Sequence, residues 1–86
     1  MIKLLIMDDN ADKINRIISV LTGMCMVSAN NIDIARSLNS GRKKLSENFY
    51  DLLLLDLVLP VDDDEPIEPG KSENFIDELS RIGRFK

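Results

Sequence analysis

Three aspartates follow the two most apolar stretches of this 86-residue chain. Asp8 and Asp9 come directly after the apolar run 2–7, and Asp56 follows the leucine run 52–55. In open parallel α/β sheets, neighbouring strands end at the same edge, and ligands bind in the crevice at those carboxyl ends. Carboxylates gathered there repel one another unless a cation or a proton lies between them. The pattern favours a Mg²⁺ site in which one carboxylate is free to accept a phosphoryl group.

Simpler interpretations of these aspartates stay open. The role of Asp8 and Asp9 could be limited to starting the loop that caps the first helix. Asp56 is harder to explain in this way, because an unpaired carboxylate in a buried strand is costly or stays protonated. The acidic run 62–65 is most simply a solvated loop, since it lacks the alternating ligand spacing of a calcium hand.

Hydrophobic periodicity predicts alternating strands and helices along the whole chain. We expect strands at 2–7, 31–36 and 50–59, and helices from about Ala11 to Thr22, from Asn39 or Ser40 to Glu47, and from about Glu73 to Ile82. The apolar segment 24–27 is the weaker candidate for the second strand. Residues 61–70 form a loop by composition. A βαβαβα order of this kind predicts a parallel sheet with right-handed crossovers.

Local details follow from the same pattern. Asn10 is expected to cap the first helix, Gly23 to end it, and Ser72 to cap the last helix. The leucines at 52–55 predict a strand that is buried on both faces and therefore central. The side chains expected to face inward from the three helices are Ile14, Ile17, Ile18, Leu21, Leu45, Phe49, Phe75, Ile76, Leu79 and Ile82.

Composition limits the class of protein. A length of 86 residues with 44% hydrophobic and 30% charged residues indicates one domain, 1–86. The net charge of −4 argues against direct nucleic-acid binding, which needs a basic patch. Cys25 is alone, so it forms no internal disulfide, and its apolar neighbours predict a small buried side chain. Neither a signal peptide nor a membrane-length apolar run is apparent, which predicts a cytoplasmic location without membrane attachment.

The aspartates also carry a family resemblance. Asp8-Asp9 after the first strand, and Asp56 with Pro60 four residues later, resemble the receiver domain of two-component response regulators. The run 50–56 strengthens the resemblance, which extends from the first residue to about Arg81. It implies a flavodoxin-like parallel sheet with helices on both faces, incomplete after the third helix, with strand order 2-1-3.

The resemblance also implies roles for individual residues. Asp56 would accept a phosphoryl group from a histidine kinase, since this chain has no histidine of its own. Asp9 would bind Mg²⁺ directly, Asp8 would act through a water molecule, and Val58 would offer its backbone carbonyl. The chain would then be a signalling domain and not an enzyme.

This sequence departs from the receiver pattern in its second half. Receivers complete the site with a Ser or Thr after a fourth strand and a Lys after a fifth, and neither position exists here. The alternative function is therefore a truncated or degenerate receiver-like module that acts through self-association or protein interaction. The strand at 50–59 would have an open side, which predicts a homo-oligomer. A metal-dependent hydrolase is a weaker third hypothesis, because no general base is visible.

Overall fold

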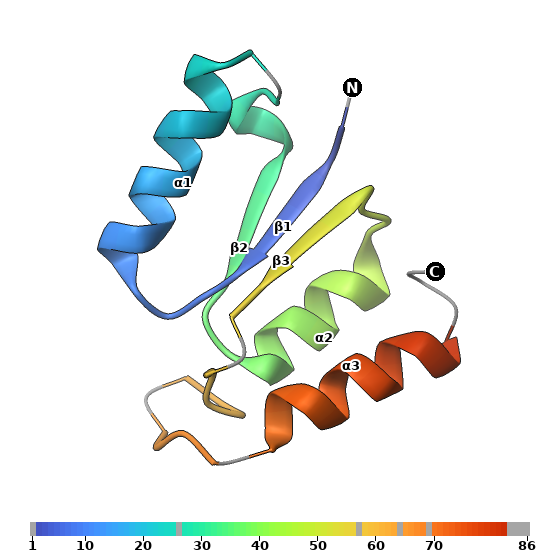
Figure 1. Ribbon diagram of the computed structural model, residues 1–86. Coiled ribbons are helices and arrows are strands. Elements are labelled where there is room, and N and C mark those ends of the chain that lie inside the picture. The colour runs from blue at the N-terminus through green and yellow to red at the C-terminus, as the bar shows by residue number, and fades with distance from the viewer. Residues whose placement is uncertain (1, 26, 57, 64, 69, 83–86) are drawn as a thin grey trace.

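Three parallel strands lie side by side in the order β2-β1-β3 (Figure 1). The computed structural model describes residues 2–25, 27–56, 58–63, 65–68 and 70–82. Within them the elements are β1 (Leu4–Met7), α1 (Ala11–Gly23), the short 3-10 helix η1 (Ala29–Asn31), β2 (Ile32–Ala35), α2 (Leu38–Glu47), β3 (Leu52–Leu55) and α3 (Lys71–Ile82). This α/β architecture and strand order confirm the predicted fold class, an incomplete flavodoxin-like sheet. The second strand lies in the predicted segment 31–36.

Helices cover both faces of the sheet, with α1 on one side and α2 and α3 on the other (Figure 1). Successive side chains of a strand point to opposite faces. Leu4 and Ile6 therefore pack toward α1, where they form a cluster with Ile14. Leu5 and Met7 belong to the larger cluster on the opposite face. The buried members of that cluster are Leu5, Met7, Ala35, Leu38, Leu45, Tyr50, Leu59, Phe75 and Leu79.

The central strand is β1, and β3 lies at an edge. All four residues of β1 are buried, whereas Leu52 is exposed and the other three leucines of β3 are half-buried. The prediction of a strand buried on both faces is therefore wrong for 52–55. An apolar run indicates which side chains a strand contains. The burial of that strand depends on the strands and helices that the fold places beside it.

Helix α1 ends at Gly23, as predicted. The residue in the left-handed region after it is Cys25, with φ 56°. Its amide donates to the carbonyl oxygen of Thr22, which satisfies one of the carbonyls left free at the helix end. Cys25 is consequently exposed and not the buried side chain that its neighbours indicated.

Helix α2 begins earlier than expected. Its N-cap is Ser37, whose side chain accepts from the amide of Ser40. Leu45 is buried as predicted, but Phe49 is 80% exposed. The helix ends at Glu47 and Asn48 is extended, so the four-residue spacing no longer places Phe49 on the same face.

Helix α3 begins at Lys71, directly after Gly70, which has φ 80°. The carbonyl of Gly70 accepts from the amide of Asn74, so Ser72 lies inside the helix and is not its cap. Phe75 and Leu79 are buried as predicted, whereas Ile76 is 45% exposed. The side chain of Ile82 lies outside the described residues. Across the part of the chain that the structure describes, no helix combines the length and apolarity needed to cross a bilayer.

The phenol of Tyr50 joins the start of β3 to β2. Its hydroxyl donates to Oδ2 of Asp33. Burial, followed by this hydrogen bond and the negative charge of Asp33, raises the pKa of Tyr50 above its ordinary value. The folded state therefore holds the phenolic proton more tightly than the unfolded state does, and stability falls as the pH rises above about 10.

Alkaline titration tests this contact, because Tyr50 is the single tyrosine of the chain. We expect phenolate absorbance to appear only above pH 10, together with unfolding. Replacing Asp33 with asparagine removes the neighbouring charge and is expected to lower the pKa of Tyr50 toward its ordinary value. An ordinary titration of Tyr50 in the folded wild-type protein would contradict the observed contact.

Candidate functional site

The candidate site lies at the carboxyl edge of the sheet. Backbone hydrogen bonds continue there for one residue beyond the ends of β1 and β3. Met7 is in register with Ala35 on one side and with Leu55 on the other. The amide of Asp8 donates to the carbonyl of Ala35 at 3.0 Å, and the amide of Asp56 donates to the carbonyl of Met7 at 2.9 Å. Backbone hydrogen bonding therefore fixes Asp8 and Asp56 side by side, at the ends of the neighbouring strands β1 and β3.

The three aspartates come together as the sequence predicted. One carboxylate oxygen from each of Asp8, Asp9 and Asp56 lies within 4.8 Å of the other two. Asp8 is buried, Asp9 is exposed and Asp56 is intermediate. Oxygen donors that converge in this way are the type that Mg²⁺ prefers, and their partial exposure leaves room for the waters that it retains. The donor set therefore fits a hard divalent cation.

A lysine that the sequence analysis did not select lies over these carboxylates. The Nζ atom of Lys13 is 3.0 Å from Oδ2 of Asp8 and 3.9 Å from Oδ2 of Asp56. Lys13 lies in the first turn of α1, where Asn10 is the N-cap, as predicted. The ion pair with Asp8 raises the pKa of Lys13, so the ammonium stays protonated. The aspartates are thus partly neutralised by a side chain of the protein itself.

Asp8 is the most enclosed member of the cluster. Burial by itself would raise its pKa, but the hydrogen bond from the amide of Asn10 and the ion pair with Lys13 outweigh burial. The pKa of Asp8 is therefore below its ordinary value, and the carboxylate is charged at neutral pH. Its Oδ1 atom accepts from Asn10 at 3.0 Å, while Oδ2 faces Lys13.

Asp56 keeps one oxygen available. Its Oδ1 atom accepts from the amide of Val58 at 3.0 Å, which holds the carboxylate in place. Oδ2 makes the longer approach to Lys13, and 21% of the side chain is exposed. Val58 thus supports Asp56 through its amide; the use of its carbonyl as a metal ligand remains a prediction.

A hollow of about 180 Å³ opens beside the cluster, between α1 and the end of β3. Its walls combine apolar side chains with the charged groups of the site, namely Ile6, Ile17, Leu54, Leu55, Asp8, Lys13 and Asp56. A small molecule that enters it would reach Asp56 without displacing the core.

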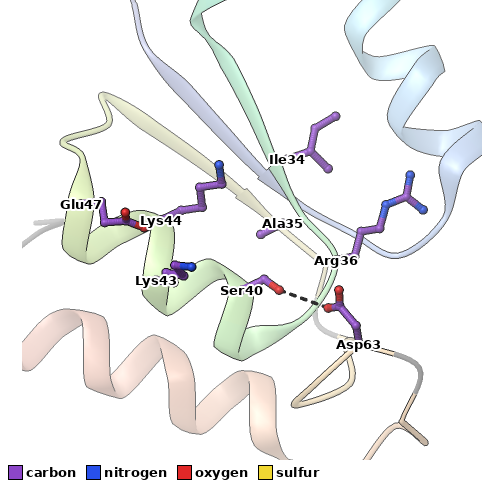
Figure 2. Close-up of a pocket in the computed structure, with 8 residues that line it drawn as sticks. All are labelled: Ile34, Ala35, Arg36, Ser40, Lys43, Lys44, Glu47 and Asp63. Atoms are coloured by element: carbon purple, nitrogen blue, oxygen red, sulfur yellow. Dashed lines mark hydrogen bonds between the residues drawn. The ribbon is translucent and has the colours of Figure 1, made fainter.

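A larger hollow, of about 570 Å³, lies along β2 and α2 (Figure 2). It is lined by Ile34, Ala35, Arg36, Ser40, Lys43, Lys44, Glu47 and Asp63. The hydroxyl of Ser40 donates to Asp63 at 3.1 Å, as the dashed line shows. Charges of both signs surround an open surface here, so its lining indicates no single ligand chemistry, and the acidic cluster remains the stronger candidate site.

One signal in the sequence could have identified Lys13. The positive end of the helix macrodipole disfavours a lysine in the first turn, unless anions lie nearby. Lys13 stands three residues after the N-cap Asn10, and the helix begins next to the carboxyl end of β1. A cation in this unfavourable place, four residues after the second of two adjacent aspartates, indicates that the aspartates neutralise it.

Comparisons with protein-family models, with curated proteins and with solved structures found no match to this chain. Its function must therefore be inferred from the geometry of the site.

Proposed function

We propose that this chain is a receiver-like signalling domain that accepts a phosphoryl group on Asp56. The observation that supports this function most strongly is the position of Asp56, a partly exposed carboxylate held beside Asp8 and Asp9 at the carboxyl edge of a parallel sheet. Val58 holds Oδ1, which leaves Oδ2 as the available nucleophile. The donor would be a phosphohistidine of a kinase or a small acyl phosphate.

When acetyl phosphate is the donor, the phosphoryl group is transferred from an oxygen of acetate to an oxygen of Asp56. A bond forms between Oδ2 of Asp56 and phosphorus, and the bond from phosphorus to the acetate oxygen breaks. Acetate leaves with the electron pair of the broken bond. Mg²⁺, when bound by Asp9 and Asp8, would offset the charge of the carboxylates and of the incoming phosphoryl oxygens.

The test is the intact mass of the folded protein after incubation with MgCl₂ and acetyl phosphate. We expect one phosphoryl adduct that depends on Mg²⁺ and is sensitive to hydroxylamine, as an acyl phosphate must be. A folded protein that gains no adduct would contradict the proposed function.

A second candidate function is assembly through the outer edge of β3, which pairs with no further strand among the residues that the structure describes. All four residues of β3 are leucine, and Leu52 is 45% exposed. The other edge strand, β2, is flanked by charged side chains from Arg36, Lys43 and Lys44, which discourage edge pairing. Self-association through β3 would add a strand at this edge and cover the leucines.

Light scattering over a concentration series tests this second function. We expect the wild-type mass to rise with concentration, and Leu52→Lys to keep the chain monomeric because it places a charge on the β3 edge. Ile34→Lys is the matched control on the β2 edge, where Ile34 is 36% exposed, and it should associate like the wild type. A wild-type monomer at every concentration would exclude assembly through β3.

A further inference from the structure

The ammonium of Lys13 lies beside two of the carboxylates that a metal ion in the acidic cluster would contact. It is 3.0 Å from the buried carboxylate of Asp8 and 3.9 Å from Asp56. Asp8 and Asp56 are two of the three residues whose carboxylates each place one oxygen within 4.8 Å of the others. A divalent cation that approaches them meets a positive charge already paired with one of its ligands.

Two features let this charge move. The side chain of Lys13 is 52% exposed, and its flexible four-carbon stem extends from the first turn of α1. The backbone of Lys13 is fixed separately, because its amide donates to the side chain of Asn10 at 3.0 Å. The ammonium can therefore withdraw into water while the helix and the carboxylates stay in place.

We propose that Lys13 is the resident counterion of the acidic cluster and sets how tightly the cluster binds a divalent metal ion. Without metal, Lys13 limits the repulsion between Asp8 and Asp56. When metal binds, the ammonium must leave Asp8. The loss of this ion pair offsets part of the favourable free energy of metal binding. The inference rests on the proposed function for the identity of the metal ligands.

Substitution of Lys13 separates its charge from its bulk. Lys13→Met keeps most of the stem and removes the charge, so we expect Mg²⁺ to bind about three to ten times more tightly than to the wild type. Lys13→Arg retains a cation and should bind Mg²⁺ about as weakly as the wild type does. Isothermal titration calorimetry with MgCl₂ measures these affinities directly and needs no phosphoryl donor.

Two controls localise the effect. Lys43→Met removes the same charge from an exposed position on α2, away from the cluster, and should change the affinity by less than about twofold. Adding Asp9→Ala to Lys13→Met should weaken binding again, because it removes a proposed ligand. Circular dichroism checks that each variant is folded, and Lys13→Gln replaces Lys13→Met if the latter is not.

The outcomes distinguish this inference from the function on which it rests. Binding of Mg²⁺ to Lys13→Met that is no tighter than to the wild type overturns the counterion role, whatever the phosphorylation assay shows. Tighter binding that the Asp9→Ala change reverses supports the counterion role, even if Asp56 accepts no phosphoryl group. In that case only the proposed phosphoryl transfer fails.

Discussion

Replacing Asp56 with asparagine is expected to abolish the phosphoryl adduct that the wild-type chain forms with Mg²⁺ and acetyl phosphate. The amide has no anionic oxygen to attack phosphorus, although it has nearly the same shape as the carboxylate. Its carbonyl oxygen can still accept from the amide of Val58, as Oδ1 does in the wild type. The variant should therefore fold normally and lose only the reaction.

The matched control for this experiment is Asp12→Asn. Asp12 is exposed in the first turn of α1, and the substitution changes the net charge by the same amount. Intact mass spectrometry should show an unchanged adduct in Asp12→Asn and none in Asp56→Asn. An adduct at the wild-type level in Asp56→Asn would place the accepting group elsewhere and refute its assignment to Asp56.

The largest loss of stability is expected from Phe75→Ala. Phe75 on α3 has no exposed surface and packs in the larger core cluster. The guanidinium of Arg42 lies 5.2 Å from the centre of the Phe75 ring. Arg42 also forms a bidentate salt bridge with Glu78. The ring therefore supports both the apolar and the charged contacts between α2 and α3.

Truncation of a buried phenylalanine to alanine costs about 3–5 kcal/mol. A domain of this size has a total stability of about 5–10 kcal/mol, so Phe75→Ala should remove a large share of it. Urea denaturation followed by circular dichroism measures the change. The control is Ile76→Ala on the same helix, which is 45% exposed and should change the free energy of unfolding by less than about 1 kcal/mol. Similar losses in both variants would contradict the observed packing of α3.

Residues 2–7 and 52–56 show what the sequence by itself determined. Their apolar runs, each followed by aspartate, predicted two parallel strands with acidic side chains at a common edge. The structure brings Asp8, Asp9 and Asp56 together there. This prediction holds because the parallel register is local and repetitive: when Met7 pairs with Leu55, the next residues of the two strands must also be neighbours.

Tertiary structure decided the features that depend on distant partners. Leucines look alike in a central strand and in an edge strand, so the run 52–55 by itself suggested a central strand, whereas the sheet has the order β2-β1-β3 that the resemblance implied. The exposure of Phe49 depends on where α2 ends, and that of Cys25 on how the chain leaves α1. The contacts of Lys13 with Asp8 and Asp56 required α1 to be placed over the carboxyl edge of the sheet. Hydrophobic pattern and spacing are read along the chain, whereas burial and charge pairing depend on what the fold places beside each residue.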